Sequence, residues 1–174
     1  GAGTAAGASF DIGNGFTGAL GYTGDGSTAN GLLTKEGSDV YGGQLSYAAD
    51  SYGVSVTYAN IESADDTTFW GLNGYWTPDS AGSMPSISVG YEMGDPDTAN
   101  DSTQWFAGFQ WDEVGPGTLG AAVGTIGAVT DGNEEYLMYE AFYSYPVNDG
   151  MTITPVVYIQ ETVSTSDDIT GVMV

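Results

Sequence analysis

Hydrophobic and polar residues alternate along most of this chain. In the segment TTFWGLNGYWTP, residues 67–78, the large side chains of Trp70, Leu72 and Trp76 all occupy even positions, and mostly smaller or polar residues stand between them. Successive side chains of a β-strand point to opposite faces, so this spacing predicts a strand with one apolar and one polar face.

The same alternation returns throughout the sequence, whereas helical periodicity does not. No stretch of about 12 residues repeats its apolar positions with a helical period, and 28 glycines, which disfavour helices, are spread along the chain. We therefore expect an all-β protein with no substantial helix and about eleven strands. The predicted strands cover residues 3–12, 15–23, 39–49, 52–60, 67–77, 84–94, 103–112, 118–127, 135–145, 151–161 and 169–174.

The connections between these strands alternate between two kinds. Short, turn-like connections lie at 13–15, 48–52, 78–83, 112–117 and 146–150, and connections that carry most of the acidic residues lie at 23–39, 62–66, 94–102, 130–135 and 161–168. Consecutive hairpins place connections of the same kind at the same end of a sheet. The pattern predicts an antiparallel up-and-down meander with its acidic loops at one end.

Two architectures fit such strands. A soluble β-sandwich buries its apolar faces between two sheets, whereas a transmembrane β-barrel turns them to lipid and keeps a polar interior. Strands of about nine to eleven residues suit a tilted bilayer crossing, and aromatic residues at both ends of the apolar faces resemble membrane-interface girdles. These features favour part of a transmembrane β-barrel. The predicted lipid-facing or interface aromatics are Tyr52, Tyr58, Trp70, Trp76, Trp105, Trp111, Tyr143 and Tyr145, with Leu72, Ile87, Val89 and Phe109 expected on the same side.

The opposite faces predict a wet lumen, because they are rich in Gly, Ser, Thr and Gln and carry a few carboxylates. Rings of carboxylates in a pore favour cations. The alternative is that these polar side chains pair with one another in a filled interior. The candidate pore-lining residues are Asp11, Gln44, Glu92, Gln104, Gln110, Glu140 and Gln160.

Two prolines bear on the predicted strands. Pro155 lies within the strand expected at 151–161, where its missing N–H removes a ladder hydrogen bond. We expect either a bulge there or a partly unpaired strand. Pro85 is easier to place, because proline can open a strand.

Composition narrows the function classes. The formal net charge is −22, with one Lys or Arg against 23 acidic residues, so nucleic acid is a poor partner and a channel of this charge would prefer cations. A 41% hydrophobic and 13% aromatic content argues against disorder. The sequence has no Cys and no His, which excludes disulfides, thiolate metal sites and imidazole catalysis.

Three motifs suggest other chemistry. GNGFTG at 13–18 matches a dinucleotide-binding pattern, but an alternating strand comes after it, so Asn14 and Gly15 indicate a tight hairpin turn. Glu92 and Glu140 could form a glycosidase pair, although they come from non-neighbouring predicted strands. Two acidic loops could hold calcium, the alternative being plain solvated loops. Their candidate ligands are Asp95, Asp97 and Asp101 in one loop, and Asp131, Glu134 and Glu135 in the other.

Several segments resemble cyanobacterial outer-membrane porins of the carbohydrate-selective group. The resemblance rests on YSYPVNDGMTITPVVYIQE (143–161), DDITGVMV (167–174), FDIGNGFTGALGYTGDGST (10–28) and GVSVTYANIESADDTTFWGLNGYWTP (53–78). It implies a β-barrel larger than eleven strands, usually ending in an aromatic residue and preceded by an S-layer-homology domain and a coiled coil. Residues 1–174 show none of these additions, and the last residue is Val174. We therefore expect 1–174 to be a single β-barrel segment of a larger porin.

The sequence thus predicts a porin of the bacterial outer membrane and not an enzyme. It would pass small hydrophilic solutes or ions by diffusion, contact membrane lipids, form homo-oligomers and need no cofactor, apart from the calcium considered above. One alternative is an extracellular β-rich structural protein that self-assembles through open strand edges. Another is a soluble β-sandwich binding module.

Overall fold

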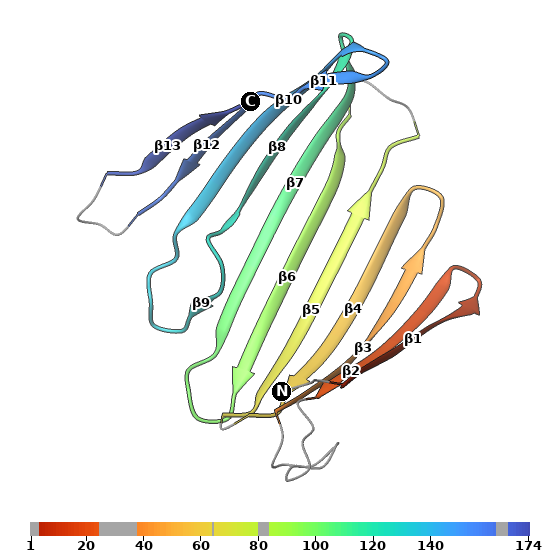
Figure 1. Ribbon diagram of the computed structural model, residues 1–174, viewed down its shortest axis with the longest axis vertical. Helices are drawn as coiled ribbons and strands as arrows, with labels where there is room; N and C mark the ends of the chain where they lie inside the picture. The colour runs from red at the N-terminus through yellow and green to blue at the C-terminus, as the bar shows by residue number, and fades with distance from the viewer. Residues whose placement is uncertain (1–3, 25–37, 64, 80–83, 163–166) are drawn as a thin grey trace. The chain divides into compact units, whose positions relative to one another are not determined.

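The computed structural model describes residues 4–24, 38–63, 65–79, 84–162 and 167–174, which contain thirteen strands and no helix (Figure 1). The strands are β1 (Thr4–Gly13), β2 (Phe16–Gly24), β3 (Asp39–Ala48), β4 (Tyr52–Ile61), β5 (Thr67–Trp76), β6 (Ser86–Pro96), β7 (Ser102–Val114), β8 (Gly117–Thr125), β9 (Val129–Thr130), β10 (Leu137–Asn148), β11 (Met151–Ile153), β12 (Val156–Gln160) and β13 (Ile169–Met173). Among these residues, no helix is long and apolar enough to cross a membrane.

The strands follow one another through a single sheet. The hydrogen-bonded order is β1-β2-β3-β4-β5-β6-β7-β8-β10-β12-β13, with β11 beside β10 and β9 beside β7. Apart from the two short strands, neighbours in sequence are neighbours in the sheet, and their pairing is antiparallel. The all-β, up-and-down meander expected from the sequence is confirmed, and the eleven strands of the main order correspond to the eleven predicted segments.

The strand count differs from the prediction at two places. The two-residue β9 lies in the acidic connection after β8, where no strand was expected. The strand predicted at 151–161 is divided into β11 and β12. Most of the acidic connection at 23–39, and parts of the connections at 62–66, 78–83 and 161–168, lie outside the described residues.

Pro155 explains the division between β11 and β12. Tyr145 pairs with Ile153 and Phe142 pairs with Val156, so the same number of residues separates the partners on both strands and no bulge intervenes. The Tyr143 N–H donates to the Pro155 carbonyl at 3.1 Å. Proline has no N–H, so the reciprocal bond cannot form. Of the two expectations, the partly unpaired strand is the one that the structure has.

The first hairpin turn forms as the sequence predicts. Asn14 and Gly15 connect β1 and β2 with φ angles of +54° and +85°. A two-residue turn with both φ angles positive matches the twist of the flanking strands, and Asn-Gly is the pair that tolerates it best. The next element along the chain is β2 rather than a helix, so the dinucleotide-binding interpretation of this motif is excluded.

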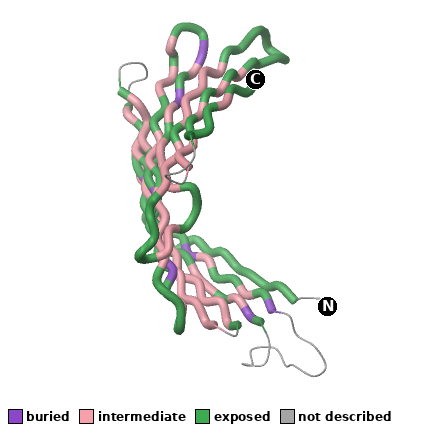
Figure 2. Tube along the Cα trace, turned by 90° about the vertical axis from the view of Figure 1, so that its left-hand side faces the viewer, coloured by how far each residue is buried: buried purple, intermediate pink, exposed green. Residues whose placement is uncertain are grey.

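The sheet has no hydrophobic core. Among the described residues, no hydrophobic side chain is buried, and the few buried positions are glycines and Asp39 (Figure 2). A soluble sandwich needs a second sheet over its apolar face, and here one sheet contains every strand. The structure therefore does not support the sandwich alternative.

Candidate functional site

The chain divides into two compact units, which are described separately. The N-terminal unit comprises Gly1–Asn73 and Tyr91–Thr103, and the C-terminal unit comprises Gly74–Gly90 and Gln104–Val174. In each unit the candidate site is the polar face of the strands together with the acidic loops at one end.

The polar face of the N-terminal unit carries Asp11 and Gln44. Gln44 lies opposite Thr57, and its Nε2 donates to Thr57 Oγ1 at 3.2 Å. Asp11 lies opposite Thr17, and its Oδ1 accepts a 2.7 Å hydrogen bond from the Gly13 N–H. Residues directly opposite each other in an antiparallel pair share a face. The strand pairing therefore brings both candidates to one surface of β1–β4, among small and hydroxyl-bearing neighbours.

The other face of this unit is apolar. Directly opposite residues build rows across β1–β4, one of which joins Phe10, Gly18, Leu45 and Val56. The next row includes Tyr58, whose ring contacts that of Trp70 on β5 with centroids 4.9 Å apart. Leu45 is 51% exposed and Trp70 is 47% exposed. Tyr58 and Trp70, two of the predicted aromatics, thus share one unburied apolar surface. Tyr52 lies an even number of residues before Tyr58 on β4, so it belongs to the same face.

Glu92 on β6 also lies on a face away from Trp70. Gly94 lies two residues after Glu92 on the same strand, so both lie on the same face. A Cβ on Gly94 would contact the Phe69 ring at 2.9 Å and Ser102 Oγ at 2.8 Å. Phe69 and Trp70 are successive residues of a strand and point to opposite sides. The structure therefore places an aromatic ring, as well as polar groups, on the face of Glu92.

In the C-terminal unit, three candidates lie on one face of β7–β12. Gln110 lies opposite Gly120, Glu140 lies between Ala122 and Tyr158, and Gln160 lies opposite Met138. Gln104 lies an even number of residues before Gln110 on β7, so it belongs to the same face. Gln110, Glu140 and Gln160 thus each face a small, aromatic or apolar residue across these strand pairs rather than another candidate.

Aromatic rings on this same polar face are the feature that sequence reasoning missed. Phe142 and Tyr158 share the face of Glu140. A Cβ on Gly120 would run into the Phe142 ring, and a Cβ on Gly171 would run into the Tyr158 ring, so each ring lies over a cross-strand glycine. The signal was present in the alternation, since Phe142 falls on the predicted face of Glu140 and Tyr158 falls on the predicted face of Thr152 and Thr154. The glycine opposite each ring becomes visible only once the strands are paired.

The apolar face of the C-terminal unit ends in anchored aromatic side chains. Near the acidic loops, Trp105 Nε1 donates to Glu135 Oε2 at 3.2 Å. Near a short turn, the Tyr143 hydroxyl donates to the Val114 carbonyl at 2.7 Å. Aromatic residues with a polar tip favour the membrane–water interface. The remaining predicted members are half-buried or exposed: Trp76, Ile87, Val89, Phe109, Trp111 and Tyr145.

Carboxylates organise the acidic loops of both units. In the N-terminal unit, Asp65 Oδ1 accepts hydrogen bonds from the N–H and hydroxyl of Thr98, at 2.9 and 2.8 Å, and joins two loops. In the C-terminal unit, Glu161 Oε2 accepts from the Leu137 N–H at 2.7 Å, and Glu134 Oε2 accepts from the Tyr136 hydroxyl at 2.7 Å.

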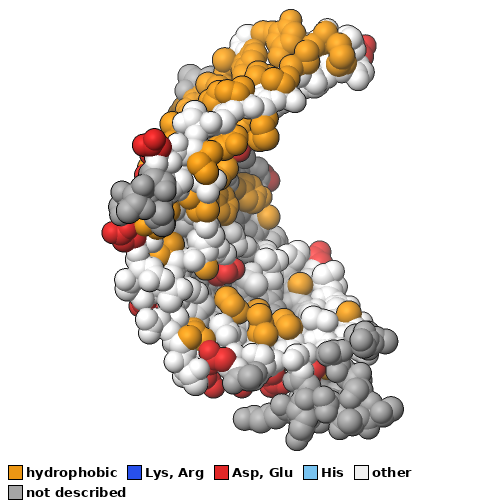
Figure 3. Space-filling view, turned by 60° about the vertical axis from the view of Figure 1, so that its left-hand side comes forward, with side chains coloured by type: hydrophobic (Ala, Val, Ile, Leu, Met, Phe, Trp, Pro, Cys, Tyr) orange, Lys and Arg blue, Asp and Glu red, His pale blue; other side chains and the backbone are white. Residues whose placement is uncertain are grey.

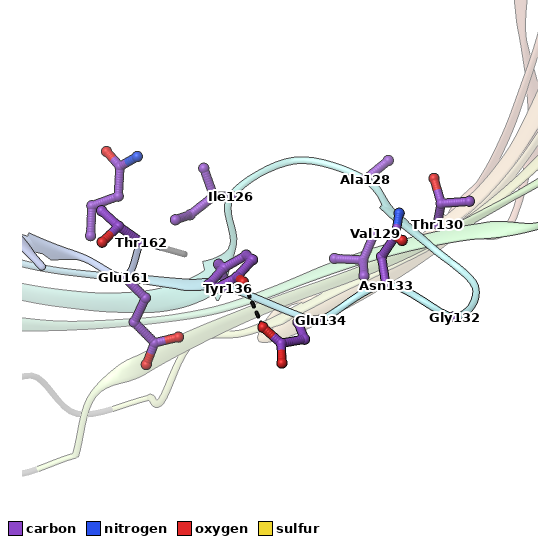
Figure 4. Close-up of a pocket in the computed structure, with 11 residues that line it drawn as sticks. Ile126, Ala128, Val129, Thr130, Gly132, Asn133, Glu134, Tyr136, Glu161 and Thr162 are labelled. Carbon is purple, nitrogen blue, oxygen red and sulfur yellow. Dashed lines mark hydrogen bonds between the residues drawn. The ribbon is translucent and has the colours of Figure 1, made fainter. Parts of the chain in front are cut away.

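A cavity of about 780 Å³ lies beside Glu134 and Glu161 (Figure 4). Both carboxylates point to the same side of the chain in this view, away from Ile126. The carboxylates of Glu134 and Glu161 thus hold the acidic loops in place through their hydrogen bonds to Tyr136 and Leu137.

The geometry does not favour two other hypotheses. The described residues contain no group of three acidic side chains that could hold a metal ion, so neither Asp95, Asp97 and Asp101 nor Asp131, Glu134 and Glu135 are gathered as calcium ligands. Glu92 and Glu140 belong to different units and to strands that are not neighbours in the sheet, so no glycosidase geometry is formed within either unit.

Charge on the described surface has one sign. The single basic residue, Lys35, lies outside the described residues. Figure 3 accordingly shows carboxylates and hydrophobic side chains, with no Lys or Arg. A surface of this kind attracts cations and repels anions.

The chain was compared with known proteins, and the sequence model of a family described as Gram-negative porin matches residues 2–164. Searches against curated proteins and against solved structures found no match.

Proposed function

The chain belongs to the Gram-negative porin family, and we propose that it forms part of the wall of a passive, water-filled channel for small hydrophilic solutes and ions. Members of this family are outer-membrane channels and not enzymes, so this is an outer-membrane protein. The alternative of an extracellular filament-forming protein gains no support from this membership.

One observation supports the channel most directly: a single sheet with an apolar face, a polar face and no hydrophobic core. Among the described residues every large apolar side chain keeps part of its surface exposed. Apolar surface of this extent is stable only against another apolar phase. Hydrocarbon on one side and water on the other satisfy both faces, as in the wall of a membrane channel.

We further propose that the channel prefers cations. Asp11, Glu92 and Glu140 lie on the polar faces, and no described residue carries a positive charge. Carboxylates that line a pore lower the energy of cations and raise that of anions. The acidic loops of each unit add further negative charge.

Reversal potentials of the protein in planar bilayers test this proposal. Under a potassium chloride gradient, we expect potassium to be favoured over chloride at about 0.1 M salt, and the preference to weaken near 1 M as the Debye length falls from about 10 Å to about 3 Å. Glu140→Gln should reduce the preference, whereas Glu140→Asp, which keeps the charge, should not. Chloride selectivity at low salt, or equal effects of both variants, would contradict cation selectivity, and the absence of conductance would contradict a channel formed by this chain alone or by its homo-oligomer.

The strand count bears on how the channel is completed. The main order has an odd number of strands, and single-chain bacterial barrels have an even number, which supports a segment that further strands complete, or homo-oligomeric association. The resemblance in the sequence supports selectivity for carbohydrates. Swelling of liposomes that contain the protein in isotonic sugar solutions would measure it.

A further inference from the structure

A second cavity, of about 460 Å³, opens on the polar face of the C-terminal unit. It lies toward the ends of the strands that short turns connect, away from the acidic loops. We call it the Asp112 pocket. The residues that line it are Tyr75, Thr77, Ser86, Ile87, Ser88, Gly108, Phe109, Gln110, Asp112, Ala121, Ala122 and Phe142.

Small residues keep the Asp112 pocket open, and an aromatic ring bounds it. Gly108 and Ala122 are directly opposite each other on β7 and β8. A Cβ on Gly108 would approach Ser88 Oγ to 2.8 Å, so glycine keeps this part of the pocket open. On the next row, the Phe142 ring lies over Gly120, which holds the ring against the sheet. The pocket therefore combines an apolar surface with hydroxyl groups.

Asp112 supplies a positioned negative charge. Its Oδ1 accepts hydrogen bonds from Gln110 Nε2 at 3.0 Å and from Thr118 Oγ1 at 3.4 Å. An ionised carboxylate has about four lone-pair sites on its two oxygens. Two neighbours thus orient this carboxylate through one oxygen, and further acceptor sites remain for a donor inside the pocket.

The surroundings select the charge of a ligand. Glu140 lies on the same face, directly opposite the pocket residue Ala122. The described residues include no Lys or Arg that could bind an anion. A metal ion is not favoured either, because no three acidic side chains of the described residues come together.

We propose that the Asp112 pocket binds small organic ammonium compounds with an aromatic or aliphatic body. The ammonium group donates to Asp112, as charged donors and carboxylates do. The body lies against Phe142 and Tyr75, whose rings also attract a cation electrostatically. This inference rests on the proposed channel only in that solutes passing along the polar face would reach the pocket.

Three probes of the same shape test the charge requirement: benzylammonium, benzyl alcohol and benzoate. Each is titrated by saturation-transfer NMR onto the whole chain refolded in detergent micelles. Benzylammonium should bind about threefold or more tightly than benzyl alcohol, and benzoate should not bind measurably.

Matched variants locate the site. Asp112→Asn should weaken benzylammonium binding about threefold or more, while Asp50→Asn, which removes the same charge from a different turn, should leave it unchanged. Phe142→Leu should weaken it by a similar factor, while Phe106→Leu, on the same face but outside the pocket lining, should not. Asp112→Glu and Phe142→Tyr keep the charge and the ring, and should retain binding if the fold is intact by circular dichroism.

Failure here is distinguishable from failure of the channel. Equal affinity for benzylammonium and benzyl alcohol, or equal losses in Asp112→Asn and Asp50→Asn, would overturn the pocket even in a protein that conducts cations. Conversely, Asp112-dependent binding by a protein that never conducts would sustain the pocket and contradict the channel.

Discussion

At the scale of single residues, glycines decide how closely neighbouring strands can pack. Gly21 and Gly42 lie directly opposite each other on β2 and β3, yet their surroundings differ. A Cβ on Gly42 would collide with the Tyr58 carbonyl oxygen and approach the Ala59 Cα to 3.0 Å, whereas a Cβ on Gly21 would meet nothing within 4 Å. The two positions provide a matched experiment.

We expect Gly42→Ala to lower the free energy of unfolding by about 1–3 kcal/mol, because backbone atoms cannot move aside as a flexible side chain can. Gly21→Ala should be neutral or stabilising by about 0.4–1 kcal/mol, because alanine restricts the unfolded chain. Urea titrations in detergent micelles, followed by tryptophan fluorescence, measure both changes. Equal effects of the two substitutions would show that this contact does not limit the position.

At the scale of elements, Pro155 separates β11 from β12 although both pair with β10 in the same register. Pro155→Val supplies an N–H facing the Tyr143 carbonyl. We expect the two strands to become continuous and the unfolding free energy to rise by up to about 1 kcal/mol. Hydrogen exchange should show the new amide at position 155 to be as protected as that of Val156. Pro85→Val is the control, because Pro85 precedes β6 and interrupts no ladder.

Fast exchange at position 155, at the rate of turn amides, would contradict this account. It would mean that Thr154 and position 155 are held apart from β10 by something other than the missing N–H. The present contacts indicate otherwise, since the Thr154 hydroxyl already donates to Ser144 Oγ across the gap at 3.2 Å.

At the scale of the whole molecule, the missing core determines where the chain can fold. Burial of apolar surface is the main favourable term in folding, and no hydrophobic side chain of the described residues is buried by the protein itself. We expect the isolated chain to aggregate or remain unfolded in plain buffer and to form its sheet in detergent micelles or lipid. Circular dichroism and size-exclusion chromatography in both conditions measure this. A well-folded monomer in plain buffer would contradict the lipid-facing assignment.

Much of this protein could be predicted from its sequence, because the side-chain period of a strand is two residues. That period determined which residues of one strand share a face. The apolar or polar face on which Trp70, Gln44 and Glu140 lie could therefore be predicted before any pairing was known. The Asn14-Gly15 turn was readable as well, since few residue pairs accept two positive φ angles. The interruption at Pro155 followed from a missing N–H.

Only the tertiary structure decided which side chains meet across strands. Strand register determines that Phe142 lies over Gly120 and that Ser88 lies beside Gly108, and nothing in the local pattern specifies these long-range partners. The same holds for β9, whose two residues are too few to show a period and pair with β7 through the fold of a loop. The sequence alone determined the two faces, because alternation is local, whereas the pocket and the loop contacts depend on pairing between distant segments.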